Sequence, residues 1–145
     1  MGLEFSTEGQ PDWRWLDGHQ VDPDLTPWSQ DHPATNSTGR CGGLLTSGLL
    51  TDQPCSDSNR LSRFVCERPL AAPPRCGEGW EHHLGSCYKK YHHEKMEWQA
   101  ARAKCREDAG ADMIIINTED ENNYVKQFAT DNGIDIWIGI YEKVL

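Results

Sequence analysis

The chain has 145 residues, 37% of them hydrophobic, and a formal net charge of −9 from 23 acidic and 14 basic side chains. This length allows one domain or two very small ones. The acidic surface disfavours nucleic-acid binding because it repels phosphate. The longest nearly apolar run, residues 113–116, is far shorter than the roughly 20 residues that span a bilayer. We therefore expect no nucleic-acid partner and no membrane segment.

Residues 1–70 are expected to form strands and long loops. Trp13-Arg14-Trp15 alternates large and polar side chains and precedes Asp17-Gly18, which is typical of a strand entering a tight turn. Residues 21–40 are rich in proline and small polar residues, which favours a loop with Trp28 as its one large anchor. Three further strands are expected in residues 41–45, 48–55 (after a turn) and 61–67.

A short, stiff segment, Ala-Ala-Pro-Pro at residues 71–74, divides the chain. Residues 64–67 before it have the pattern of a final strand, because apolar and polar residues alternate up to a proline. Residues 75–80 after it have the pattern of a first strand, opened by a cysteine and a glycine turn. In the middle of the chain, the pattern of a final strand therefore precedes the pattern of a first strand.

The second part predicts two helices and four strands. A strand near Trp80 is followed by one at residues 85–89 and by an amphipathic helix at residues 95–109, ended by Gly110. Thr118 and Glu121 form a capping box for a second helix, which Gly133 ends. Buried strands are expected at residues 113–116 and 134–140. The buried helix residues are expected to be Trp98, Ala101, Cys105 and Ala109 in the first helix and Tyr124, Val125 and Phe128 in the second.

The six cysteines predict a disulfide framework. They include no C-x-x-C pair, which leaves zinc-finger and thioredoxin-like motifs without support, and by themselves they allow 15 pairings. Asn36-Ser37-Thr38 is a glycosylation sequon, so Asn36 is a predicted glycosylation site. The first residues do not show the basic-then-apolar pattern that is typical of a signal peptide. We expect a secreted or extracellular protein that is part of a larger chain.

The ordered cysteines and tryptophans resemble those of the C-type lectin-like domain. Residues 76–140 are similar to its first half, and residues 7–68 to its second half. The residues that carry the first likeness are Cys76, Trp80, Cys87, Tyr88, Trp98, Ala101, Cys105, Glu121 and the Trp-Ile-Gly of residues 137–139. Those that carry the second are Glu8, Gly9, Trp13, Trp15, Asp17, Gly18, Trp28, Pro33, Cys41, Cys55 and the Phe-Val-Cys-Glu of residues 64–67.

The resemblance implies an α+β fold, with two helices on short antiparallel sheets and a long loop region, in circularly permuted order. Residues 1–70 would be the second half of the domain, 71–75 a linker and 76–145 the first half. In the family the natural ends are neighbours, so a short linker would let both halves close into one domain. The alternative is a slice through tandem domains. The implied disulfides are Cys41–Cys55, Cys66–Cys105 and Cys76–Cys87.

In sugar-binding members of the family, calcium is held by a Glu-Pro-Asn or Gln-Pro-Asp triplet, a nearby glutamate and an Asn-Asp pair. Here the triplet position, residues 32–34, reads His-Pro-Ala, and the glutamate position is a glycine beside Arg40. The Asn-Asp position reads Thr51-Asp52, so Asp52 is the only retained calcium-ligand position. Because calcium needs six to eight oxygens, we expect no cofactor and no calcium at this site.

Our leading hypothesis is an extracellular recognition module that binds a glycan or protein ligand without the usual calcium chemistry. The ligand-binding candidates are Trp28, His32, Thr51 and Asp52. One alternative is a calcium-dependent lectin with altered ligands; another is an acidic structural or matrix-associated protein. No group of residues predicts catalysis, because every cysteine has an expected disulfide partner. The adjacent histidine pairs at residues 82–83 and 92–93 are expected to be surface residues, since neighbours on a strand face opposite sides.

Overall fold

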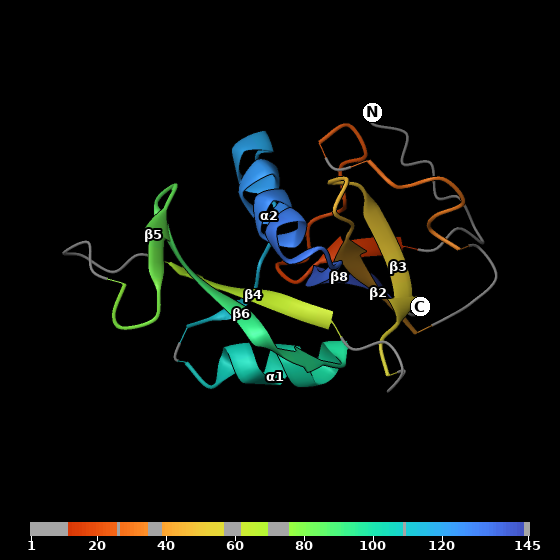
Figure 1. Cartoon of the computed structure of the whole chain (residues 1–145). Helices are drawn as coiled ribbons and strands as arrows, with labels where there is room; N and C mark the ends of the chain where they lie inside the picture. The colour runs from red at the N-terminus through yellow and green to blue at the C-terminus, as the bar shows by residue number, and fades with distance from the viewer. Residues whose placement is uncertain are drawn as a thin grey trace, which may run out of the picture.

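A computed structural model of the chain describes residues 12–25, 27–34, 39–56, 62–69, 76–108 and 110–143. Within them, eight strands and two helices form an α+β fold (Figure 1). The strands are β1 (Asp12–Trp15), β2 (Arg40–Leu44), β3 (Leu50–Pro54), β4 (Ser62–Pro69), β5 (Glu81–His83), β6 (Ser86–Met96), β7 (Asp112–Met113) and β8 (Ile136–Lys143). The helices are α1 (Trp98–Arg106) and α2 (Glu119–Asn132). The predicted fold class is confirmed.

The strands make one mixed sheet in the order β3-β2-β8-β4-β6-β5, with β1 paired to β8 and β7 paired to β4. This differs from the expected short antiparallel sheets, because β4 and β8 pair in parallel and join the two regions of the fold. Strands from the two parts of the chain alternate: β8 lies between β2 and β4, and β4 lies between β8 and β6. Neither part therefore forms a sheet separate from the other.

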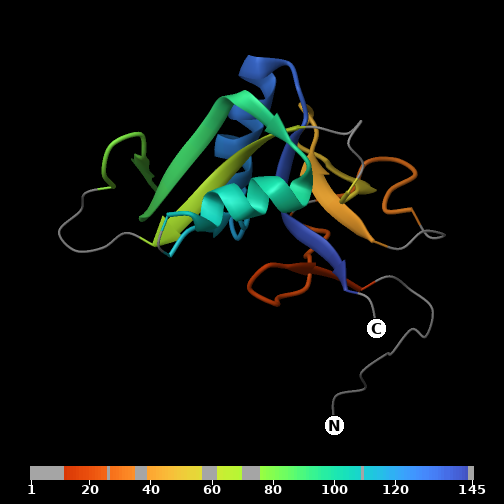
Figure 2. The ribbon, with the colours of Figure 1, turned by 90° about the horizontal axis from the view of Figure 1, so that it is seen from below.

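The sheet has a core on each face, because side chains alternate along its central strands. On β4, Val65 belongs to one core, whereas Phe64 and Cys66 belong to the other. Helix α2 covers the first core and α1 the second, and Figures 1 and 2 show the two helices on opposite faces of β4 and β6. The α1 side is rich in aromatic and cysteine residues, and the α2 side is mainly aliphatic.

Helix α2 begins and ends where the sequence predicts. The Thr118 hydroxyl accepts a hydrogen bond from the Glu121 backbone N–H at 3.1 Å, and the Glu121 carboxylate accepts one from the Thr118 N–H. Gly133 caps the other end in the left-handed conformation, with φ 59°. Val125 and Phe128 are buried as expected, but Tyr124 is only half-buried.

Helix α1 is shorter than predicted at both ends. It was expected at residues 95–109, but Met96 still belongs to β6, where it pairs with Ser62. The Met96 carbonyl also accepts a hydrogen bond from Trp137 Nε1 at 2.9 Å. Strand pairing thus outweighs helix propensity before residue 98. The helix ends at Arg106 rather than at Gly110, which lies in the turn that follows.

Several strand boundaries also differ from the predictions. Strand β4 runs on through Pro69, and β8 covers residues 136–143 instead of 134–140. Only the first residue of the expected strand 113–116 belongs to a strand, β7. The next residue, Ile114, still joins two strands, because its N–H donates to the Val65 carbonyl at 3.0 Å and its carbonyl accepts from the Gly139 N–H at 2.8 Å.

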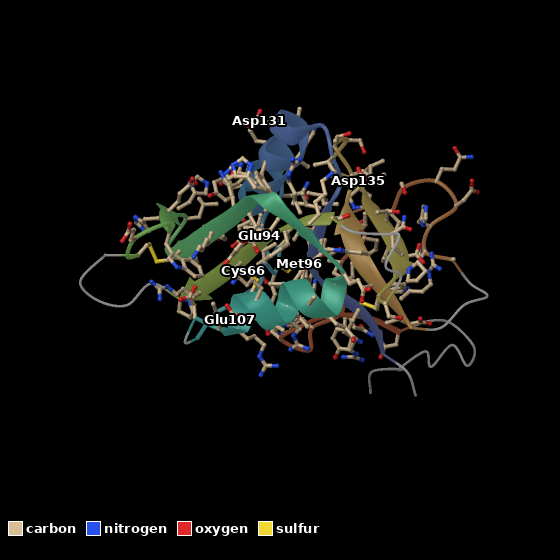
Figure 3. All side chains as sticks on the ribbon, turned by 60° about the horizontal axis from the view of Figure 1, so that its bottom comes forward. Cys66, Glu94, Met96, Glu107, Asp131 and Asp135 are labelled. Carbon is tan, nitrogen blue, oxygen red and sulfur yellow. A yellow bond between two sulfur atoms is a disulfide. The ribbon has the colours of Figure 1, made fainter. Side chains whose placement is uncertain are left out.

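Three disulfides hold the fold, and they are the pairs that the resemblance implies: Cys41–Cys55, Cys66–Cys105 and Cys76–Cys87. Cys66 lies on β4 in the sheet and Cys105 on α1, so their bond links the two parts of the chain across 39 residues of sequence (Figure 3). The linker at residues 71–75 lies outside the described residues.

Candidate functional site

The predicted ligand-binding residues lie where the loop at residues 27–34 meets the hairpin of β2 and β3. Backbone hydrogen bonds hold the loop against the start of β3: the Ser29 N–H donates to the Leu50 carbonyl at 2.8 Å, and the Leu50 N–H donates to the Pro27 carbonyl at 2.9 Å. In the hairpin, Asp52 lies opposite Gly42. Arg40 is two residues from Gly42 and therefore on the same face as Asp52.

The Asp52 carboxylate is the centre of this site. Its side chain is fully buried, and each of its oxygens accepts a hydrogen bond from a different side chain. Oδ1 accepts from His32 Nδ1, and Oδ2 accepts from Arg40 Nε. The Ala34 N–H approaches both oxygens, at 3.2 and 3.3 Å. Arg40 also donates to the Asp52 backbone carbonyl at 2.9 Å, so it holds both the side chain and the strand.

These contacts keep Asp52 ionised. Burial by itself would raise the pKa of this carboxyl, but the hydrogen bonds from His32 and Arg40, together with the Arg40 charge, hold the pKa below its ordinary value. The Arg40 side chain is only 15% exposed, so the ion pair is largely shielded from water. The loop is thus tied to the hairpin by a buried charge pair.

The other two candidates differ in their surroundings. Thr51 is buried, and its hydroxyl lies 3.4 Å from His32 Nε2. His32 therefore contacts both Thr51 and Asp52, and the structure brings these three candidates together. Trp28 instead packs against Trp13, with the ring centroids 4.9 Å apart, at the edge of the core that α2 covers. Its ring helps to anchor the loop.

The donor set falls short of what a calcium ion requires. Calcium takes six to eight oxygen ligands, several of them carboxylate oxygens. Here one carboxylate is present, both of its oxygens already accept hydrogen bonds from N–H donors, and one of those donors is a guanidinium cation. Among the residues that the structure describes, no group of three or more His, Cys, Asp or Glu side chains is placed to hold a metal ion.

The importance of Arg40 was missed at the sequence level, where it was noted only as the neighbour of the glycine at the glutamate position. The signal was present in the hairpin: strands that pair Gly42 with Asp52 place residues 40 and 52 diagonally on one face. The predicted glycosylation site, Asn36, lies outside the described residues.

The histidine pairs lie apart from this site. His83 stacks on Tyr124 with ring centroids 4.3 Å apart, and His92 meets Phe128 edge to face at 5.0 Å. Both pairs are therefore associated with α2 rather than with the loop. In the described ranges no helix is long and apolar enough to cross a membrane.

Comparison with known proteins supports a lectin-like family. Residues 94–144 match the family model described as the lectin C-type domain. One chain of the snaclec coagulation factor IX/factor X-binding protein of Gloydius halys is 36% identical over 70 residues, which cover 45% of this chain and 45% of that protein. Snaclec 3 of Sistrurus catenatus edwardsii is 36% identical over 70 residues, covering 45% of this chain and 46% of that protein.

A receptor is also similar. The secretory phospholipase A2 receptor of Pongo abelii is 26% identical over 92 residues, which cover 59% of this chain and 6% of the receptor. The chain thus spans less than half the length of the snaclecs and a small part of the receptor. No solved structure matches the chain significantly.

The mixed sheet with a helix on each face, its three disulfides and these matches support the resemblance to a C-type lectin-like domain. The family model matches residues 94–144 and the snaclecs match 45% of the chain, so these parts of the sequence carry the likeness to C-type lectins.

Proposed function

We propose that this chain is an extracellular recognition module that binds a protein ligand without calcium. The observation that carries this proposal is the pairing of Asp52 with Arg40 and His32. In the family's sugar-binding members, the corresponding aspartate would help to hold calcium. Here the Arg40 guanidinium and the His32 imidazole donate hydrogen bonds to its oxygens. These side chains therefore give no support to the binding of a sugar through a calcium ion.

Two further observations favour a protein ligand outside the cell. The similar proteins include one named for binding coagulation factors IX and X, and another named as a receptor for secretory phospholipase A2. The three disulfides are typical of proteins in an oxidising compartment. We also propose binding rather than catalysis, because all six cysteines are in disulfides and none is free to act as a nucleophile.

The calcium part of the proposal is tested on the chain alone. The refolded, oxidised chain is stripped with EDTA and titrated with calcium while tryptophan fluorescence is followed, with a calcium-dependent C-type lectin as the positive control. We expect no saturable change and the same urea unfolding midpoint with and without EDTA. A saturable response at micromolar calcium would contradict the proposal and favour a lectin with altered calcium ligands.

The ligand part is tested by a screen with two arms. Immobilised chain is exposed to coagulation factors IX and X and to secretory phospholipase A2, and labelled chain is applied to a glycan array, each with and without EDTA. We expect saturable binding to a protein. Reduced and alkylated chain is the control for binding that does not need the fold. Binding confined to glycans and lost in EDTA would contradict the proposal, and so would adsorption only to calcium carbonate mineral, which a matrix protein would show.

We further propose that the two parts of the chain form one domain in permuted order, rather than a slice through two tandem domains. Two features support this: strands of the two parts alternate in one sheet, and Cys66 bonds to Cys105 across the linker. Proteolysis under non-reducing conditions followed by mass spectrometry is expected to recover a peptide pair joined through these two cysteines. Free thiols at both positions in oxidised chain would show that the parts do not close on one another.

A further inference from the structure

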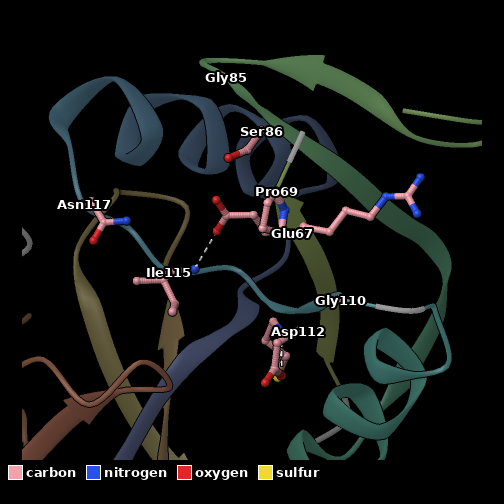
Figure 4. Close-up of a pocket in the computed structure, with 10 residues that line it drawn as sticks. Glu67, Pro69, Gly85, Ser86, Gly110, Asp112, Ile115 and Asn117 are labelled. Carbon is pink, nitrogen blue, oxygen red and sulfur yellow. Dashed lines mark hydrogen bonds between the residues drawn. The ribbon is translucent and has the colours of Figure 1, made fainter. Parts of the chain in front are cut away.

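A pocket of about 410 Å³ lies away from the loop site, beside the end of β4 (Figure 4). Its volume is within the range of small-ligand sites. The lining combines polar groups from three segments: Glu67 of β4, Ser86 of β6, and Asp112 and Asn117 on either side of Ile115. Ile115, which is partly exposed, contributes apolar surface beside them. Polar groups that converge over an apolar floor are the usual composition of a binding pocket.

Glu67 is the central polar group of this pocket. Figure 4 shows its carboxylate between Ser86, Ile115 and Asn117. One oxygen, Oε2, accepts a hydrogen bond from the Ile115 N–H at 3.2 Å, and the Ser86 hydroxyl also hydrogen-bonds to the carboxylate. Within the described part of the chain, no ion pair joins Glu67 to a basic side chain.

Arg68 and Arg102 are both held by other groups. Arg68 lines the pocket, but its guanidinium donates to the Cys76 carbonyl and lies 4.5 Å from the centre of the Trp80 ring. Arg102 makes two hydrogen bonds of 3.2 Å to Asp112 and so neutralises that second carboxylate. Neither of these two arginines therefore neutralises the charge of Glu67.

The surroundings of Glu67 make its charge costly. Burial raises the pKa of Glu67 above its ordinary value despite the hydrogen bonds from Ile115 and Ser86, and the charges of Glu121 and Asp17 raise it further. A cation placed in the pocket would relieve this cost, because an opposite charge stabilises the ionised carboxylate. A ligand with a positive head and an aliphatic stem would also cover the partly exposed apolar surface of Ile115.

We propose that this pocket receives a basic side chain, arginine or lysine, of the protein ligand, with Glu67 as its charge partner. This inference rests on the proposed protein-binding function. Asn117 and Ser86 offer additional oxygens to the guanidinium or ammonium group, which carries up to five N–H donors. The stem lies on Ile115. The pocket thus selects positive charge on the partner surface, in agreement with the net charge of −9 on this chain.

The test uses N-acetyl-arginine amide and N-acetyl-lysine amide as probes, and N-acetyl-citrulline amide as a neutral probe of nearly the same shape as arginine. Each is titrated into ¹⁵N-labelled full chain while backbone amide shifts are recorded. The Ile115 amide is a direct reporter because it donates to Glu67. We expect the basic probes to shift Ile115, Ser86 and Asn117 with a dissociation constant on the order of millimolar, and citrulline to bind at least about tenfold more weakly.

Two matched variants each replace one glutamate with glutamine, one inside the pocket and one outside it. Glu67→Gln keeps an acceptor for the Ile115 N–H, and we expect it to weaken the basic probes by about tenfold or more. Glu94→Gln removes an exposed carboxylate on β6 (Figure 3) and is expected to change their affinity less than about twofold. The amide spectrum itself shows whether each variant is folded.

Three results would overturn the inference: no shifts around Ile115, equal binding of citrulline and arginine, or unchanged affinity in Glu67→Gln. These results are independent of the ligand screen. If a protein ligand is found but the probes do not bind the pocket, the pocket assignment is wrong and the function stands. If the probes bind but no protein does, the pocket is a site for cationic small molecules and the protein-binding function is wrong.

Discussion

The buried pair of Arg40 and Asp52 makes a quantitative prediction about stability. Replacing Arg40 with methionine keeps much of the aliphatic side chain but removes the donors to the Asp52 carboxylate and to its backbone carbonyl. Breaking a buried ion pair by removing one partner costs about 3–5 kcal/mol. Because His32 and the Ala34 N–H still contact the carboxylate, we expect the lower end, about 3 kcal/mol.

Urea unfolding of the oxidised chain, followed by tryptophan fluorescence at pH 7, measures this loss. At a slope of about 2 kcal/mol per M, the midpoint would fall by roughly 1.5 M. Arg14→Met is the matched control, since Arg14 pairs with Asp12 in a more exposed site, with side chains 28% and 20% exposed. We expect this control to cost less than about 1 kcal/mol.

A double-mutant cycle with Asp52→Asn separates the pair from the loss of packing. Once the charge of Asp52 is gone, Arg40→Met should cost clearly less, by about 1 kcal/mol or more. Acid should have a similar effect: the folded pKa of Asp52 is lowered, so its stabilisation is present above the unfolded value of 3.8 and is lost as the pH falls through the folded pKa. A loss below about 1 kcal/mol in Arg40→Met, with no coupling in the cycle, would refute the role given to this pair.

Three other predictions concern the sheet and the pocket. Replacing both Cys66 and Cys105 with alanine should lower stability by about 4 kcal/mol in the chain-entropy model, since their sequence separation is 39. Gly139→Ala should cost about 1–3 kcal/mol, because a Cβ there would lie 2.9 Å from the Ile114 carbonyl oxygen. Glu67→Gln should raise stability at pH 7 and lose that advantage at pH 4, because a folded pKa above the unfolded value of 4.5 makes the ionised carboxylate unfavourable only at higher pH.

Urea unfolding checks all three, and each has its own contrary result. Removing the Cys76–Cys87 bond, with a sequence separation of 11, should cost about 1 kcal/mol less than removing Cys66–Cys105. If removing Cys76–Cys87 cost more than removing Cys66–Cys105, the result would argue that Cys66–Cys105 does not close the domain. Wild-type stability in Gly139→Ala would mean that β8 and the Ile114 segment are not in close contact. A Glu67→Gln variant that is less stable at pH 7 would show that ionised Glu67 supports the fold.

The local signals of the sequence were sufficient for some elements. The capping box of Thr118 and Glu121 and the glycine at 133 predicted both ends of α2, because these residues act on the backbone of their own helix. The pattern around Phe64 likewise predicted a strand there, although not its central place in the sheet.

The boundary between β6 and α1 was not predictable from local patterns. Residues 95 and 96 suit a helix, but Met96 pairs with Ser62 and accepts a hydrogen bond from Trp137, which is 41 residues away in the sequence. Contacts of this kind are set by the sheet, and they outweigh a propensity worth a few tenths of a kcal/mol per residue.

For the candidate site too, some features could be predicted from the sequence and others only from the tertiary structure. The sequence by itself determined the fold class, the likeness to C-type lectins and the loss of most calcium-ligand positions, because these depend on residue identity and order. Only the tertiary structure decided that Arg40 and His32 use the Asp52 carboxylate and that Glu67 lies in a pocket without a basic partner among the described residues. The physical reason is that burial and charge pairing depend on which strands meet, and those strands are far apart along the chain.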